Sequence, residues 1–188
     1  MATLEPELEE LRTRLTADLG AVMDAVAPLT QTQADWNPAE GNWSVGEVLH
    51  HLVLSNRLFA VVARRLVQHG RTMGLAARPG SRRSWPRVRA IAEVGVSGPV
   101  RNPDRVTPVH GLPIEQLRRD LAESHMSVVA QIPSLAGLDL DALRFPHPFG
   151  FDVNLYHWVD IAGAHGRRHL TQIQAIAATP GFPPANAT

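Results

Sequence analysis

Apolar residues recur at steps of three and four along the first 26 residues of the chain. This spacing places them on one stripe of an α-helix. Pro28 then predicts the end of the helix. The polar tract TQTQADWNPAEGN that follows predicts a loop. The apolar positions of the stripe are Leu4, Leu8, Leu11, Leu15, Leu19, Val22 and Val26.

A second amphipathic helix is predicted from Ser44 to about Gln68. The tetrapeptide SVGE at its start has the form of a capping box, in which the Ser44 hydroxyl and the Glu47 carboxylate accept hydrogen bonds from backbone N–H groups. Gly70 predicts the point where the chain leaves the helix. The apolar face consists of Val45, Val48, Leu49, Leu52, Phe59, Val62 and Leu66.

Two further helices are predicted in the second half of the chain. Pro113 suits the first position of the third helix, which Pro133 ends. A loop containing FPHPFGFD follows, and Asp152 is the expected N-cap of the fourth helix. The third stripe consists of Leu117, Leu121, Val128 and Ile132, and the fourth of Leu155, Trp158, Ala162, His165, His169, Ile173 and Ile176.

Four amphipathic helices without a convincing strand predict an all-α protein with a four-helix bundle, forming a single domain over residues 1–188. Residues 70–112 form a long irregular connection between the second and third helices. Such a length favours a bundle that does not simply alternate in direction. The connection includes a basic stretch at 78–89, which is interpreted either as a solvated loop or as a lid that binds carboxylates.

Composition narrows the functional classes. Lys plus Arg and Asp plus Glu both number 18 in 188 residues, and this balance counts against a nucleic-acid partner. The absence of cysteine excludes disulfides and a cysteine nucleophile, so any thiol must come from outside the chain. No signal-peptide pattern and no apolar run of about 20 residues is present, so we expect a cytoplasmic protein with no membrane partner.

The fourth stripe contains two histidines at i and i+4, a spacing that lets two imidazoles bind one ion. The alternative is a pair of interior histidines with polar partners. The second helix offers His50 or His51 as a third ligand, and His51 lies nearer the apolar face. Gly166 stands where the H-E-x-x-H motif has its glutamate, which argues against a metalloprotease of that type.

Three segments together resemble the DinB-like superfamily, also called the DinB/YfiT family. They are NWSVGEVLHHL at 42–52, HPFG at 147–150 and WVDIAGAHGRRHLTQI at 158–173. The resemblance implies a four-helix bundle, often a homodimer, with a divalent metal ion held by His51, His165 and His169. Zn and Ni are the expected metals, and the remaining coordination positions would take water or substrate.

The resemblance implies a small-molecule substrate and leaves three functions open. The first is transfer of a low-molecular-weight thiol, such as bacillithiol, to an electrophile. The second is hydrolysis by metal-activated water, for which Glu47 is the candidate general base. The third is a non-catalytic metal-binding protein of the stress response or an interaction module. Gln172 is a candidate hydrogen-bond partner of a ligand imidazole, and Arg167 and Arg168 are interpreted as surface or dimer contacts.

Overall fold

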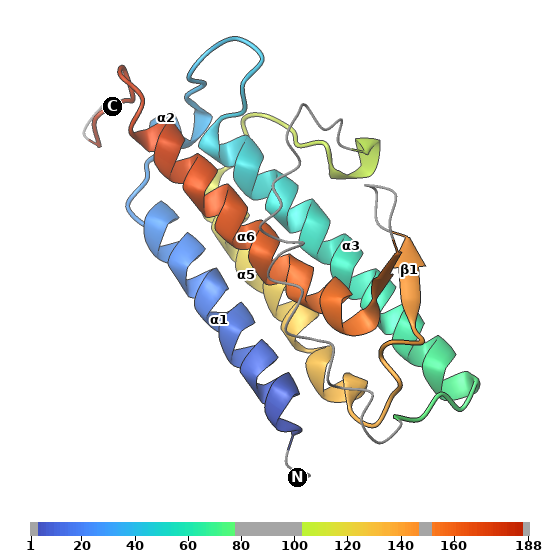
Figure 1. Ribbon diagram of the computed structural model, residues 1–188. Coiled ribbons are helices and arrows are strands. Elements are labelled where there is room, and N and C mark those ends of the chain that lie inside the picture. The colour runs from blue at the N-terminus through green and yellow to red at the C-terminus, as the bar shows by residue number, and fades with distance from the viewer. Residues whose placement is uncertain (1–3, 78–102, 147–151, 186–188) are drawn as a thin grey trace.

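The computed structural model describes residues 4–77, 103–146 and 152–185, and its main feature is a bundle of four long helices (Figure 1). The predicted all-α bundle is therefore confirmed. The basic stretch at 78–89 and the HPFG tract at 147–150 lie outside the described residues. The four helices are α1 (Pro6–Val26), α3 (Val45–Thr72), α5 (Ile114–Val129) and α6 (Leu155–Ala177).

The four helices do not alternate in direction along the chain. α1 and α6 run one way, and α3 and α5 run the other way (Figure 1). α3 packs against α5 and α6, and α1 packs against the same two helices. Because α3 and α5 are parallel, the chain must return along the bundle between them, which explains the long connection between the second and third helices.

The apolar core is divided into two clusters, one toward each end of the bundle. One cluster joins the start of α1 and α6 to the ends of α3 and α5, with Leu11, Phe59 and Trp158 among its members. The other joins the opposite helix ends and includes Leu49 and Ile173. Between them lies a layer with buried polar side chains, which must find partners to offset their desolvation. Its members include His51, Asn56, His125 and His169.

Capping residues fix where α3 and α6 begin. The predicted capping box of α3 is present, with both the Ser44 and the Glu47 hydrogen bonds formed. The prediction of Asp152 as the cap of α6 was wrong, because the cap is Asn154, whose Oδ1 accepts from the His157 N–H at 2.9 Å. Asp152 is instead the exposed first residue of a short strand, two residues before the cap Asn154.

The end of α3 also differs from the prediction. The helix continues through Gly70 to Thr72, so this glycine does not end it. Gly70 is buried, and a Cβ at this position would lie 2.8 Å from Leu143 Cδ1. The glycine therefore permits close packing of another segment on the helix, and the helix ends one turn later than its sequence pattern suggests.

Several short elements connect the long helices, and the sequence pattern did not predict them. The tract read as a loop contains α2 (Gln31–Asp35), which has its own capping box from Thr30 and Gln33. Two strands pair in antiparallel fashion before α6, with Phe145 opposite Val153. These strands are β1 (Arg144–Pro146) and β2 (Asp152–Asn154), and the 3-10 turns are η2 (Asp104–Val106) and η3 (Ile132–Leu135).

Among the described residues, α3 is long and apolar enough, by length and composition alone, to cross a membrane. However, 67% of its most apolar stretch is buried inside the bundle. A core helix shows this kind of burial, so α3 gives no positive sign of membrane insertion. The cytoplasmic location stays a prediction.

Candidate metal centre

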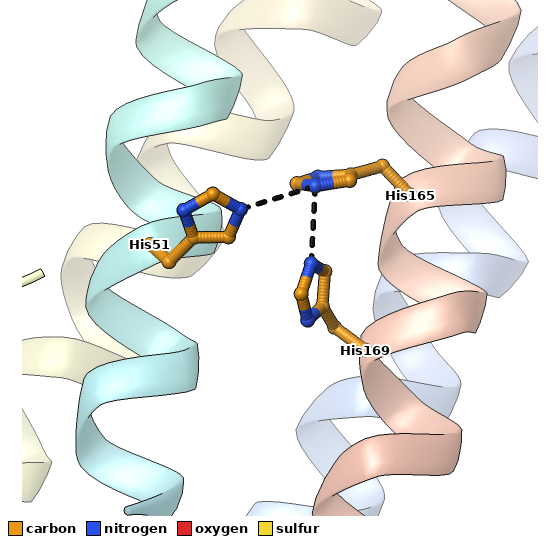
Figure 2. A group of neighbouring side chains, drawn as sticks. All are labelled: His51, His165 and His169. Atoms are coloured by element: carbon orange, nitrogen blue, oxygen red, sulfur yellow. Dashed lines mark hydrogen bonds between the residues drawn. The ribbon is translucent and has the colours of Figure 1, made fainter. Parts of the chain in front are cut away.

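Three imidazole rings converge in the space between α3 and α6 (Figure 2). His51 comes from α3, while His165 and His169 come from successive turns of α6. The Nε2 atom of His165 lies 3.2 Å from Nε2 of His51 and 3.1 Å from Nε2 of His169. The structure therefore brings together the three histidines that the sequence singled out, as a group whose ligand atoms all lie within 4.8 Å of one another.

Hydrogen bonds at the far side of two rings define which nitrogen faces the centre. His51 Nδ1 lies 2.7 Å from the Val106 carbonyl oxygen, which can only accept, so Nδ1 carries the hydrogen. His169 Nδ1 lies 2.8 Å from Gln172 Oε1 and donates to it in the same way. Both neutral rings therefore direct the lone pair of Nε2 toward the centre. Gln172 has the partner role proposed for it from the sequence.

The three Nε2 atoms cannot all satisfy one another by hydrogen bonding. A neutral His165 ring carries at most one hydrogen on Nε2, and that hydrogen cannot point at His51 and His169 together. At least one of the close contacts then places two lone pairs against each other. A cation held between the rings would remove this repulsion, and ligands about 2.0–2.1 Å from a tetrahedral zinc ion lie about 3.3 Å apart. The donor set therefore fits a divalent metal ion.

Electrostatics keep these rings in the neutral form that binds metals. Burial lowers the pKa of His169 to about 4, and the repulsion that a protonated His51 would exert acts in the same direction. Burial also lowers the pKa of His51, and the positive charge of Arg168 acts in the same direction. Because metal ions compete with protons for imidazole nitrogens, both rings are ready to bind a metal ion at neutral pH.

The segment 103–110, which includes η2, is anchored to α3 next to the centre. Besides the bond from His51 to Val106, the Val109 N–H donates to His50 Nδ1 at 2.8 Å. His110 Nδ1 lies 3.3 Å from the Glu47 carboxylate. His50 is thus engaged by this segment and lies outside the three-histidine group. The Val106 contact could not be predicted, because a backbone carbonyl has no signature in the sequence.

The Glu47 carboxylate is held by hydrogen bonds at the start of α3 and is not part of the three-histidine group. Its Oε2 accepts from the Ser44 N–H at 2.8 Å and from Asn37 Nδ2 at 3.0 Å. Burial opposes ionisation of this carboxyl, but the hydrogen bonds from Ser44, Asn37 and His110 outweigh it, so the pKa of Glu47 is lowered. The capping role is present in the structure, and the role of general base stays a prediction.

The two arginines beside the histidines differ in their contacts. Arg167 forms an ion pair with Asp18 of α1, so it links two helices of the same chain. Arg168 is exposed, and its charge acts on His51 and His169. Both arginines lie on the surface, as expected, and Arg167 also bridges α6 to α1. A dimer contact stays a prediction.

Comparison with known proteins shows the family to which the chain belongs. The family model described as the DinB superfamily matches residues 7–173, and the chain belongs to this superfamily. A relative from Bacillus subtilis (strain 168), "Uncharacterized protein YuaE", is 25% identical over 154 residues, which cover 79% of this chain and 85% of the relative. No solved structure gives a significant match.

Proposed function

We propose that the protein is a metal-dependent enzyme that transfers a low-molecular-weight thiol to an electrophilic small molecule. His51, His165 and His169 hold the divalent ion, with Zn or Ni as the expected metal. A bound dipositive ion lowers the pKa of a thiol that it coordinates and so favours the reactive thiolate. The chain has no cysteine, so the thiol is a co-substrate of the bacillithiol type.

The observation that carries the proposal is the composition of the donor group. Three Nε2 atoms converge, and no carboxylate of the described residues joins them. Three neutral imidazoles leave the full charge of a dipositive ion available to an anionic ligand, and an open coordination position is typical of catalytic sites. Transfer of an external thiolate needs no general base from the chain once the thiolate has formed.

Within this proposal, the three imidazoles bind the ion, and neighbouring groups of the chain orient the imidazoles. The Val106 carbonyl and Gln172 hold His51 and His169 in the tautomer that directs Nε2 to the ion. The charge of Arg168 adds positive potential to the site, which favours a thiolate over a thiol. Hydrolysis remains the alternative, and it would require a base such as Glu47, whose carboxylate is occupied by hydrogen bonds in the structure.

The first test is metal content. We expect the purified protein to bind one divalent ion per chain, and we expect His51→Ala, His165→Ala and His169→Ala each to lower the affinity by more than about 100-fold. The matched control is His69→Ala, which removes an exposed imidazole of α3 outside the group and should retain the ion. Full metal occupancy in all three site variants would contradict the proposed centre.

The second test separates thiol transfer from the alternatives. The metal-loaded protein is mixed with bacillithiol, mycothiol or glutathione and a chromogenic electrophile, and conjugate formation is followed with and without chelator. We expect conjugation that depends on the metal and on at least one thiol. Metal-dependent loss of an ester substrate without a thiol, abolished by Glu47→Gln, would instead favour hydrolysis. Metal binding with neither activity would favour the non-catalytic function.

A further inference from the structure

A small cavity lies on the axis of the bundle, and all four long helices line it. α1 contributes Asp18, α3 contributes Asn56, α5 contributes His125 and α6 contributes Gly166, with apolar side chains between them. The cavity has a volume of about 10 Å³. A space of this size holds about one water molecule. The cavity belongs to the polar layer between the two apolar clusters.

Two side chains that line this cavity have polar atoms without a hydrogen bond from any described residue. Asn56 is 2% exposed, and its amide forms no hydrogen bond within the described part of the chain. His125 is 3% exposed and uses Nε2 to donate to the Leu15 carbonyl oxygen at 2.8 Å. Burial lowers the pKa of His125, so the ring is neutral at neutral pH and Nδ1 is an acceptor. Buried groups of this kind normally have a partner.

Gly166 explains why the space exists. A Cβ at this position would meet no heavy atom within 4 Å, so the backbone of α6 faces open space here. Glycine inside a helix is less stable than alanine, and nothing near Gly166 forbids a methyl group. The missing side chain leaves room on the axis, next to Asn56 and His125.

We propose that this cavity is a binding site for one ordered water molecule that joins α1, α3 and α5. The water accepts a hydrogen bond from Asn56 Nδ2 and donates one to His125 Nδ1. Its second hydrogen points to the carboxylate of Asp18, whose Oδ2 already accepts from Arg167 of α6. A water molecule supplies both donors and the acceptor that these groups need. An apolar atom of the same size would leave the amide unpaired.

A structure at a resolution that shows ordered waters tests the site directly. We expect one density peak within about 2.7–3.2 Å of both the Asn56 amide and His125 Nδ1 in the wild-type protein, and no such peak in Gly166→Ala. A wild-type cavity without density would overturn the proposal. A peak with anomalous signal and metal-ligand distances would overturn it in favour of a cation.

A matched pair of alanine variants supplies a second, independent test. Gly20 lies within α1 and is not among the residues that line the cavity, and a Cβ there also meets no heavy atom within 4 Å. Gly20→Ala and Gly166→Ala therefore gain the same helix propensity, but only the second places a methyl group where the water would bind. We expect Gly20→Ala to raise the melting temperature and Gly166→Ala to lower it, with and without chelator.

The opposite result has a clear meaning. If the cavity is dry, Gly166→Ala fills empty space and should raise the melting temperature at least as much as Gly20→Ala does. Asn56→Leu also distinguishes a dry cavity from a hydrated one by whether it stabilises or destabilises the protein, and it leaves α6 unchanged. In a dry cavity the leucine removes an unpaired buried amide and stabilises the protein, whereas in a hydrated one it removes a partner of the water and destabilises it. Stabilisation by both variants would overturn the proposal.

Discussion

At the scale of single residues, the candidate centre depends on which ring nitrogen carries its hydrogen. His51 and His169 each carry a hydrogen on Nδ1 because an oxygen acceptor lies within hydrogen-bond distance of that atom. Partners of this kind orient metal-binding imidazoles and raise their affinity for the ion. The partners are as much a part of the centre as the rings, although only one of them, Gln172, is a side chain.

Removal of the Gln172 amide tests this role. We expect Gln172→Ala to lower the metal affinity by about 10- to 100-fold, because His169 loses the acceptor that fixes its tautomer. Competition with a chelating dye measures the affinity. Gln174→Ala is the matched control, since Gln174 is an exposed glutamine on the same helix. Equal affinity in Gln172→Ala and Gln174→Ala would show that the hydrogen bond does not serve the centre.

The residues of the centre show what a sequence can and cannot reveal. The spacing of His165 and His169 is visible because helix geometry relates i to i+4, and Gln172 follows from the same geometry. His51 could be chosen over His50 from its position on the apolar face. Val106 could not be found, because its contact uses a backbone oxygen and joins segments 55 residues apart.

At the scale of elements, the segment 103–110 stabilises one side of the centre. It contacts α3 at three neighbouring positions, through Val106, Val109 and His110. Each contact is a hydrogen bond or polar pair to a side chain of α3. The segment 103–110 is therefore tied to the helix that carries His51, and its position should affect metal binding.

The contact of Val109 allows this effect to be measured. Val109 is 57% exposed, and its N–H is the group that bonds to His50. Val109→Pro removes the N–H, whereas Val109→Ala keeps it. We expect the proline variant alone to lower the metal affinity, by about tenfold, because the Val106 carbonyl is held less firmly against His51. Titration with Zn²⁺ under competition measures this, and identical affinities in the two variants would contradict it.

Long elements were predictable from the sequence and short ones were not. Each long helix carries an apolar stripe over many turns, and the capping box of α3 adds a local signal at Ser44. By contrast, α2 has five residues and the strands have three each, too few to show a period. The N-cap of α6 was predicted at the wrong residue because Asp152 and Asn154 are both suitable capping residues. The choice between them depends on where β2 ends, which the sequence does not show.

At the scale of the whole molecule, buried neutral histidines make stability depend on pH. Burial lowers the pKa of His51, His125 and His169 below the usual value near 6.5. Below that pH the unfolded chain binds protons that the folded chain excludes. The contribution of these histidines to the stability of the metal-free protein is therefore present above about pH 6.5 and is lost as the pH falls toward their folded-state pKa values.

We expect the free energy of unfolding of the metal-free protein to fall between pH 7.5 and pH 4.5. For His169, whose pKa is lowered to about 4, the contribution is on the order of 3 kcal/mol. Urea unfolding in chelator at several pH values measures the slope. His169→Phe should flatten the curve, and an unchanged slope in this variant would contradict the assignment.

The parallel arrangement of α1 with α6, and of α3 with α5, has a consequence for how the molecule folds. His51 and His165 are 114 positions apart in the chain, yet their rings meet. Bringing such distant segments together carries a loop-closure cost that contacts within one helix do not. The full set of three imidazoles forms only when α6 has docked on α3. If the site binds metal as proposed, the rate of metal uptake during refolding would report when this long-range docking occurs.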